Sequence, residues 1–291
     1  MGDLIAAAPP PLPQIRAIIQ RALDEDVAWG DVTTEHSVPA DQCSHARLFA
    51  KQGGVLCGGG VFAETLAMVD PRVVVDLVQR DGAILTAGDV VACAQGPTRA
   101  LLTGERTALN FVQRLSGIAT TTRAFADRLR GLSTRLVDTR KTTPGLRVLE
   151  KYAVRVGGGH NHRFNLADAV LLKDNHLAAL EGRGMDLASA IRTLREQIPH
   201  TMRVEVEITA LAQIDAVLAG GADIVLLDNM STEDMREAVR RIAGRALTEC
   251  SGNVTLETVR ERAETGVDLI SAGALTHSAK ALDLSLEIDV G

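Results

Sequence analysis

Aromatic residues are scarce in this chain: one Trp, one Tyr and five Phe make up only 2% of its 291 residues. Few rings are therefore available to stack on nucleic-acid bases. The net charge of −6 gives no reason to expect a polyanionic partner either. We expect no nucleic acid among the ligands of this protein.

Long apolar runs are also lacking, and none approaches the roughly 18 residues of a membrane-spanning helix. We therefore expect no contact with a membrane. Residues 1–13 contain Asp3 and have no long apolar core, which is typical of a loose tail rather than a signal peptide. The four cysteines are far apart and form no Cys-x-x-Cys pair, which favours a reduced, cytoplasmic protein.

The charge is unevenly distributed along the chain. Residues 99–173 contain 14 Lys and Arg but only 5 Asp and Glu, whereas the remaining residues contain 17 and 32. A basic segment inside an acidic protein indicates a focused site for a small anion. Some of these arginines, such as Arg123, Arg128 and Arg130, are better interpreted as solvated residues of helix faces.

The first part of the chain mixes helices and strands. Ile15, Ile18, Ile19 and Ala22 share one face of a helix predicted over 14–25. Gly-rich turns separate strands predicted over 45–50, 73–80 and 90–95, and a helix is predicted over 61–69. Residues 103–130 predict one or two helices interrupted near Ser116-Gly117. We expect a small α+β unit.

From residue 134 strands and helices alternate regularly. Strands are expected over 134–138, 169–172, 203–208, 223–227, 246–250 and 268–271, with helices near 145–156, 186–198, 210–219, 231–243 and 254–265. This alternation predicts parallel βαβ units. The number of units over so few residues favours a compact α/β barrel, with an open doubly wound sheet as the alternative.

Charged or small residues follow these strands one after another. Thr139-Arg140-Lys141, Lys173, Asp228-Asn229, Ser251-Gly252-Asn253 and Ala272-Gly273-Ala274 come at or after strand ends, and strand 203–208 carries Glu205 and Glu207. The carboxyl ends of parallel barrel strands converge on one face, where such barrels have their active sites. We therefore expect a functional opening at this end of the barrel.

The chemistry at this opening is divided among the strands. Early strands supply the cations Arg140, Lys141 and Lys173, which suit a carboxylate-bearing anion. Middle strands supply Glu207 and Asp228, which could hold Mg²⁺ against a diphosphate and ribose hydroxyls. The last strands end in small turns that suit a phosphate monoester.

The Gly157-Gly158-Gly159 stretch is followed by two histidines and an arginine, His160, His162 and Arg163. It follows a helix and precedes a strand, so it is not a dinucleotide fingerprint, and it lacks the Lys of a P-loop. His160, His162 and His176 could form a zinc set, but no cysteine joins them. His162 and Arg163 are better interpreted as anion-binding residues. Glu105-Arg106 by itself indicates only a charged pair on a helix surface.

These residues belong to longer motifs that resemble one family. The chain resembles the quinolinate phosphoribosyltransferases, also called carboxylating nicotinate-nucleotide pyrophosphorylases, in order from about residue 15. The matching stretches are Glu105–Asn110, Leu115–Thr120, Asp138–Arg147, Lys151–Arg155, Gly157–Gly159, Asn161–Arg163, Leu172–His176, Val204–Glu207, Leu227–Met230, Ser251-Gly252, Gly266–Asp268 and Gly273–His277, together with Leu23–Asp26 and Gly30–Thr34.

The resemblance implies a fold and a reaction. The fold would be an N-terminal open-faced α/β sandwich over 1–115, then an incomplete, about seven-stranded α/β barrel over 116–291 whose last residues pack back on the first domain. The reaction would join quinolinate to 5-phosphoribosyl 1-pyrophosphate with Mg²⁺, giving nicotinate mononucleotide, pyrophosphate and carbon dioxide in NAD synthesis. The family also implies a homodimer with shared sites.

The resemblance further implies a role for individual residues. The quinolinate carboxylates would be surrounded by Arg140, His162, Arg163 and Lys173, with Thr139 and Lys141 nearby and Arg106 donated by the other subunit. Glu207 and Asp228 would bind ribose hydroxyls and metal. The 5′-phosphate would be held by Ser251, Gly252, Asn253, Ala272, Gly273 and Ala274. Two departures affect this pattern: Cys250-Ser251-Gly252-Asn253 replaces Ser-Ser-Gly-Gly, and Phe164-Asn165 replaces Leu-Gly.

Two other functions compete with this one. A phosphoribosyltransferase acting on nicotinate would bind one carboxylate and release no carbon dioxide, and the number of cations favours the dicarboxylate instead. A non-catalytic barrel could bind a phosphorylated metabolite, but Glu207 and Asp228 beside the cations favour catalysis. No nucleophilic side chain is required, because the ring nitrogen of the substrate itself attacks the ribose carbon.

Overall fold

The computed structural model describes residues 7–181 and 184–289, so the expected tail 1–13 lies partly outside the described residues. The chain forms two compact units, the first from Met1–Arg123, Thr142–Gly158 and Leu275–Gly291, the second from Ala124–Lys141 and Gly159–Ala274. The expected boundary at 115/116 falls inside one continuous helix, α4 (Thr98–Arg128).

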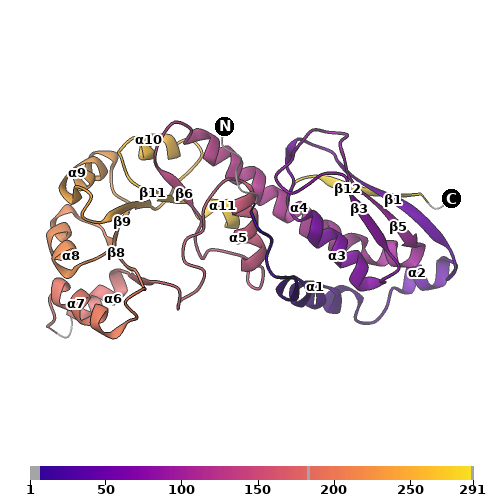
Figure 1. Cartoon of the computed structure of the whole chain (residues 1–291), viewed down its shortest axis with the longest axis horizontal. Coiled ribbons are helices and arrows are strands. Elements are labelled where there is room, and N and C mark those ends of the chain that lie inside the picture. Colours follow the sequence, from indigo (N-terminus) through magenta and orange to yellow (C-terminus); the bar gives the residue numbers. More distant parts are fainter. Residues whose placement is uncertain (1–6, 182–183, 290–291) are drawn as a thin grey trace. The chain divides into compact units, whose positions relative to one another are not determined.

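The first unit combines an antiparallel sheet with helices (Figure 1). Besides α4, its helices are α1 (Leu12–Val27), α2 (Val32–Ser37), α3 (Gly59–Val69) and α5 (Arg147–Val156). Its strands are β1 (Cys43–Ala50), β2 (Gly54–Val55), β3 (Val74–Leu77), β4 (Ile84–Leu85), β5 (Val90–Pro97) and β12 (Leu284–Asp289).

One face of this sheet carries the core. The strand order is β12-β1-β5-β3, and β2 pairs separately with β4. Along β1, buried and exposed residues alternate, so that Ala46, Leu48 and Ala50 share the buried face. They pack against Phe62 of α3 and against residues of α4, and together these side chains form the core of the first unit. The C-terminal strand β12 pairs antiparallel with β1.

The expected interruption near Ser116-Gly117 is wrong, because α4 runs through it. The two small residues instead allow close contacts to other parts of the first unit. The Ser116 hydroxyl donates to the Cys57 carbonyl and accepts from the Cys57 N–H. A Cβ at Gly117 would collide with the Lys280 carbonyl. Sequence alone could not distinguish a helix break from such a close approach.

The second unit is a parallel α/β structure. Its strands are β6 (Arg135–Val137), β7 (Val170–Leu172), β8 (Val204–Ile208), β9 (Ile224–Asp228), β10 (Leu247–Ser251) and β11 (Leu269–Ser271). The intervening helices are α6 (Asp174–Glu181), α7 (Leu187–Gln197), η1 (Leu211–Gln213), α8 (Ile214–Gly220), α9 (Thr232–Ile242) and α10 (Val259–Ala263); the short α11 (Ala274–His277) follows β11.

The sheet order is β6-β11-β10-β9-β8-β7, with every neighbouring pair parallel. Strand β6 comes first in the chain but pairs with β11, the last parallel strand, as expected where a sheet curls toward closure. Six strands form within the described residues, where about seven were expected. A single parallel bridge between His160 and Val137 lies beside β6 in place of another strand.

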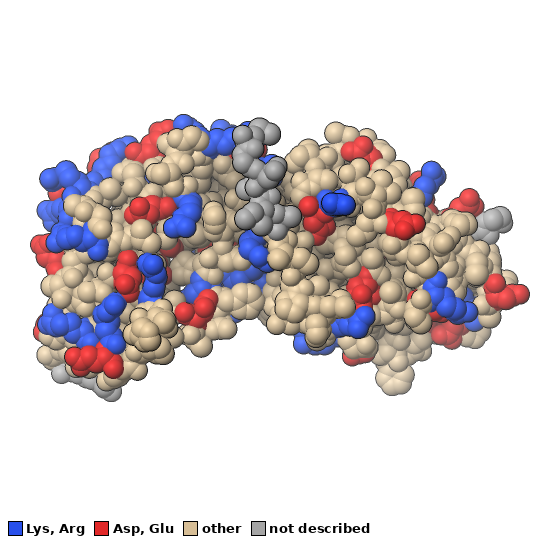
Figure 2. All heavy atoms as spheres, in the orientation of Figure 1, with Lys and Arg blue, Asp and Glu red and all other residues tan. Residues whose placement is uncertain are grey.

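Helices α6 to α10 lie along the outer side of the curved sheet (Figure 1), and most residues of β8 to β11 are buried. All five residues of β8 are buried although two of them are glutamates. No helix in the described part of the chain combines the length and the apolar character needed to cross a bilayer. On the face drawn in Figure 2, basic and acidic side chains are interspersed over each unit and form no large patch of one sign.

Candidate active site

One cavity lies at the carboxyl ends of the parallel strands. It measures about 570 Å³ and is lined by residues of the second unit alone. Eleven of the fifteen predicted site residues line it: Thr139, Arg140, Lys141, His162, Arg163, Lys173, Glu207, Asp228, Ser251, Gly252 and Asn253. Strand ends far apart in the sequence therefore converge as the alternating pattern predicts.

The four other predicted residues are not in this lining. Arg106 lies exposed on α4 in the first unit. Ala272 is buried, and its N–H donates to the Val137 carbonyl at 3.1 Å, so that group extends the sheet ladder. Gly273 and Ala274 follow at the start of α11. Their proposed phosphate contacts therefore remain predictions.

Positive charge gathers on one side of the cavity. Burial and the neighbouring Arg140 charge lower the pKa of the Arg163 guanidinium. Arg163 Nη1 donates to the Ala169 carbonyl at 2.9 Å, which fixes the direction of the side chain. Cations held this close repel one another, and a bound anion would relieve that repulsion. This side of the cavity suits a ligand with more than one carboxylate.

Lys173 and Glu207 connect the cationic side to the carboxylates. Lys173 Nζ lies 2.8 Å from Glu207 Oε2, and the Glu207 residue is 9% exposed. Asp228, the last residue of β9, accepts a hydrogen bond from Asn229 Nδ2 at 2.8 Å. Both carboxylates line the cavity. They are hard oxygen ligands of the type that Mg²⁺ prefers.

The Ser251–Asn253 turn follows β10 in an unusual conformation. Gly252 has φ of 89° and Asn253 has φ of 48°, both in the left-handed region. A Cβ at Gly252 would also collide with the Asn229 side chain, so glycine is required there on two grounds. Arg262 donates to the Gly252 carbonyl from α10. Because N–H and C=O point oppositely across a trans peptide, this bond turns the Asn253 N–H away from Arg262.

Three buried acids belong to or contact the cavity lining, and sequence reasoning gave none of them a role: Glu249 lines the cavity, Glu205 lies against the His162 ring, and Asp138 accepts from the His162 N–H. Glu205 and Glu249 are 2% and 1% exposed, and Asp138 is fully buried. Burial, together with the Glu205 charge, raises the pKa of Glu249 to about 7. The strand period of two places Glu205 on the face of Glu207 and Glu249 on the face of Ser251. That period could have found both glutamates.

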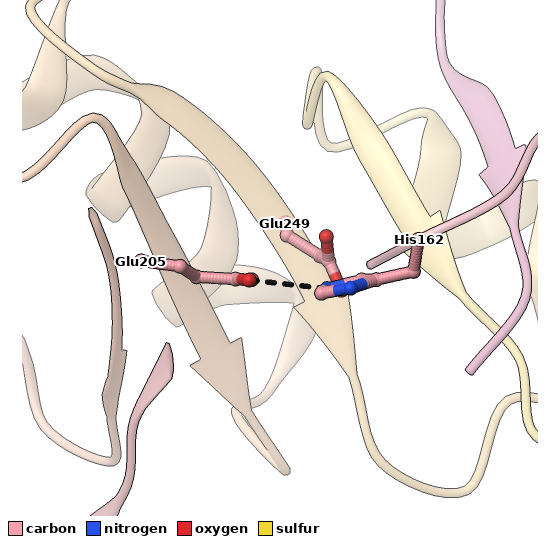
Figure 3. Close-up of side chains that lie close together, drawn as sticks. All are labelled: His162, Glu205 and Glu249. Atoms are coloured by element: carbon pink, nitrogen blue, oxygen red, sulfur yellow. Dashed lines mark ion pairs between the residues drawn. The ribbon is translucent and has the colours of Figure 1, made fainter. Parts of the chain in front are cut away.

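The same cavity does not unite the three histidines considered as a zinc set. His162 instead lies against Glu205 and Glu249, and Figure 3 shows both carboxylates pointing toward its ring. His162 Nε2 is 3.0 Å from Glu205 Oε2. Within the described residues, the one group of three or more His, Cys, Asp or Glu side chains whose ligand atoms lie close enough to share a metal ion is this His-Glu-Glu group, which contains neither His160 nor His176.

A larger hollow, of about 750 Å³, lies at the opposite ends of the strands. Two of the acids that line it, Asp223 and Asp268, have structural partners. Asp223 Oδ2 accepts from the Val204 N–H at 2.8 Å and from Arg195 Nη1 at 2.7 Å. Asp268 Oδ2 accepts from the Thr248 N–H and hydroxyl. These side chains hold the first residues of the strands in place. Residues at this end of a barrel contribute to stability rather than to catalysis.

Comparisons with known proteins agree over both units. The model of the quinolinate phosphoribosyl transferase N-terminal domain matches residues 31–116, and the model of the C-terminal domain matches residues 118–287. The chain is 41% identical to a probable carboxylating nicotinate-nucleotide pyrophosphorylase of Bacillus subtilis, covering 94% of this chain and 93% of that protein. It is 43% identical to the carboxylating nicotinate-nucleotide pyrophosphorylase of Mycobacterium leprae, covering 94% and 96%.

A solved structure gives the same result in three dimensions. The crystal structure of NadC from Streptococcus pyogenes has 44% sequence identity and a TM-score of 0.92, and the match covers 97% of this chain and 99% of that one. The similarity therefore extends over the sandwich-like unit and the barrel together.

Proposed function

This chain belongs to the quinolinate phosphoribosyl transferase family, and on that premise we propose how its barrel cavity performs the family reaction. The enzyme transfers a phosphoribosyl group from 5-phosphoribosyl 1-pyrophosphate to quinolinate with decarboxylation. The products are nicotinate mononucleotide, pyrophosphate and carbon dioxide, in the synthesis of NAD. Both substrates are multiply anionic.

One observation carries the assignment of the site. A single cavity is lined by the cations Arg140, Arg163 and Lys173 together with the carboxylates Glu207 and Asp228, and Lys173 is paired with Glu207 at 2.8 Å. This combination matches two different anions, one bearing two carboxylates and the other bearing phosphates and hydroxyls. We assign the cations to quinolinate because planar guanidinium groups pair with carboxylates through two parallel hydrogen bonds. Thr139 and Lys141 line the same cavity.

Glu207 and Asp228 would accept hydrogen bonds from the ribose hydroxyls. Each already has one chain partner, Lys173 and Asn229, so binding must exchange or share those contacts. Their donor type also fits Mg²⁺, which would be held here together with substrate oxygens. When bound, Mg²⁺ supplies positive charge against the diphosphate leaving group.

The Ser251–Asn253 turn is assigned to the 5′-phosphate. Ser251, Gly252 and Asn253 line the cavity, and Arg262 donates a hydrogen bond to the Gly252 carbonyl. Ala272, Gly273 and Ala274 follow the neighbouring strand β11 and would complete this cradle, as the family pattern implies.

The chemistry requires positioning and charge more than a nucleophilic side chain. The lone pair of the quinolinate nitrogen forms the new bond to the ribose carbon as the bond to pyrophosphate breaks. The cations fix the pyridine ring through its carboxylates, which supplies the proximity that this step needs. When the adjacent carboxylate leaves as carbon dioxide, the electron pair of the broken bond stays on the ring carbon, where the positive ring nitrogen stabilises it until that carbon takes up a proton from water.

We further propose a homodimer in which Arg106 of one subunit enters the site of the other, and a cytoplasmic location. The support for the shared site is chemical: Arg106 lies exposed and outside the cavity lining of its own barrel, and a further cation would suit a dicarboxylate.

The test is a direct assay. The purified chain with quinolinate, 5-phosphoribosyl 1-pyrophosphate and Mg²⁺ should release carbon dioxide and form nicotinate mononucleotide, whereas nicotinate should give no comparable turnover. Arg140→Ala and Lys173→Ala should abolish turnover while circular dichroism stays unchanged. The exposed Arg236→Ala of α9 is the matched control. Wild-type rates in both cavity variants would overturn the site assignment.

A further inference from the structure

The ring of His162 lies between two buried carboxylates. Its Nε2 is 3.0 Å from Glu205 Oε2 and 3.6 Å from Glu249 Oε1. Figure 3 shows Glu205 approaching from β8 and Glu249 from β10. Among the described residues, the Oε1 atoms of both glutamates are buried without a hydrogen-bond partner. Such groups are costly to bury, so the cluster requires a physical explanation.

The second ring nitrogen reveals where the proton is. The Arg163 backbone N–H donates to His162 Nδ1 at 2.7 Å. A nitrogen that accepts a hydrogen bond carries a lone pair and no proton. The proton of the neutral ring therefore lies on Nε2, where it faces Glu205.

This arrangement decides between a metal site and a hydrogen-bonded unit. One ligand atom from each of the three side chains lies within 4.8 Å of the others, close enough to share an ion. A metal needs a ring nitrogen with an available lone pair. The Nδ1 lone pair is used by Arg163, and Nε2 carries the proton. The geometry thus favours hydrogen bonds over ligation.

The remaining proton balance agrees with this choice. Two adjacent buried carboxylates do not readily ionise together. Burial and the Glu205 charge raise the pKa of Glu249 to about 7, which favours a proton on Glu249.

The His162 segment also holds its own backbone in place. The His162 N–H donates to Asp138 Oδ1 at 2.8 Å, and Asn161 Nδ2 donates to Asp138 Oδ2 at 2.7 Å. The ring then fixes the next peptide, since Nδ1 accepts from Arg163. The backbone of Arg163 is therefore set by contacts that begin at Glu205.

We propose that His162, Glu205 and Glu249 are positioning residues, with His162 as a neutral Nε2–H ring that orients Arg163 toward a substrate carboxylate. The proposal rests on the proposed function for the identity of the anion. It gives His162 a different task from the direct contact that the family resemblance implies. Its ring neither supplies a positive charge nor exchanges a proton with substrate.

The first test reads the tautomer without any substrate. Long-range ¹H–¹⁵N spectra of the full chain, assigned by comparison with His162→Asn, should show a pyridine-type Nδ1 and a pyrrole-type Nε2 at pH 7. Zinc added at one equivalent should leave these two resonances in place. An imidazolium pattern, the opposite tautomer or a zinc-dependent shift of His162 would each overturn the proposal.

The second test separates positioning from catalysis. Asn at 162 can retain an acceptor near the Nδ1 position, and Gln can retain a donor near the Nε2 position. His162→Ala should raise KM for quinolinate about tenfold, the scale of losing one or two hydrogen bonds, and should lower kcat by a smaller factor. Asn and Gln should each recover part of that KM.

If the Ala, Asn and Gln variants all lost activity to the same extent, and mainly through a lower kcat, the positioning role would be overturned. The assay of the wild type distinguishes a failure of the proposed function from a failure of the proposed role of His162. If the wild type forms no nicotinate mononucleotide, the proposed function fails, while the spectra still decide the tautomer.

Discussion

Replacing Glu249 by Gln should make the protein more stable at high pH than the wild type. Glu249 is 1% exposed, and its pKa rises from the ordinary 4.5 to about 7 because of burial and the Glu205 charge. Gln has nearly the shape of the protonated acid and cannot ionise. The substitution therefore removes the cost of ionising this buried group.

The sign follows from proton binding. A folded-state pKa above the unfolded value means that the folded protein binds more protons between those two values. The stabilisation is complete below pH 4.5 and is lost as pH rises through about 7. A shift of this size corresponds to at most about 3 kcal/mol. For a protein of this size that is about 6 to 12 °C in the unfolding midpoint.

The assay compares the thermal midpoints of wild type and Glu249→Gln from pH 5 to pH 8. The variant should already be slightly favoured at pH 5, and its advantage over the wild type should grow as pH increases through about 7. Glu196→Gln, which removes an exposed carboxylate on α7, controls for the general effect of losing one acidic charge. A variant that instead loses stability with increasing pH would show that an ionised Glu249 pairs with a charged His162, and would refute the reasoning.

Three further predictions concern other parts of the molecule. Gly117→Ala should lower the unfolding free energy by about 1–3 kcal/mol, because its Cβ meets the Lys280 carbonyl; in the same assay Gly60→Ala, with open space at its Cβ, should be neutral or stabilising. Arg262→Met should release the Gly252 carbonyl and raise KM for the phosphoribosyl donor severalfold, with little change in KM for quinolinate; equal changes for both substrates would contradict this role. Mixing inactive Arg106→Ala and Lys173→Ala subunits should restore some turnover, and no recovery after verified subunit exchange would count against a shared site.

The sequence predicted the parts of the fold that depend on local pattern. Strand and helix alternation from residue 134 predicted the parallel sheet, and the structure confirms it with strands ending within one or two residues of the expected positions. The resemblance predicted about seven strands, but the described chain forms six and a bridge at His160. A bridge of a single residue cannot be predicted from sequence, because it is too short to show the alternation of buried and exposed residues that marks a strand.

Contacts between residues far apart in the chain could not be predicted from the local sequence pattern. The sequence shows that Ser116 and Gly117 are small, yet only the folded chain shows that they contact Cys57 and Lys280 instead of ending a helix. Likewise, only the folded chain shows that the boundary predicted at 115/116 lies within the continuous helix α4.

What the sequence determined by itself is the chemistry at each strand end. Arg140, Lys173, Glu207 and Asp228 occupy positions that any parallel barrel would bring to one cavity, because strand direction and register are shared. What only the tertiary structure decided is the protonation and hydrogen bonding of the His162 ring. Whether His162 is a cation, a ligand or a neutral hydrogen-bonding ring depends on which atoms approach its two nitrogens. Those atoms come from β8, β10 and the next peptide, and their distances are set by packing rather than by spacing along the chain.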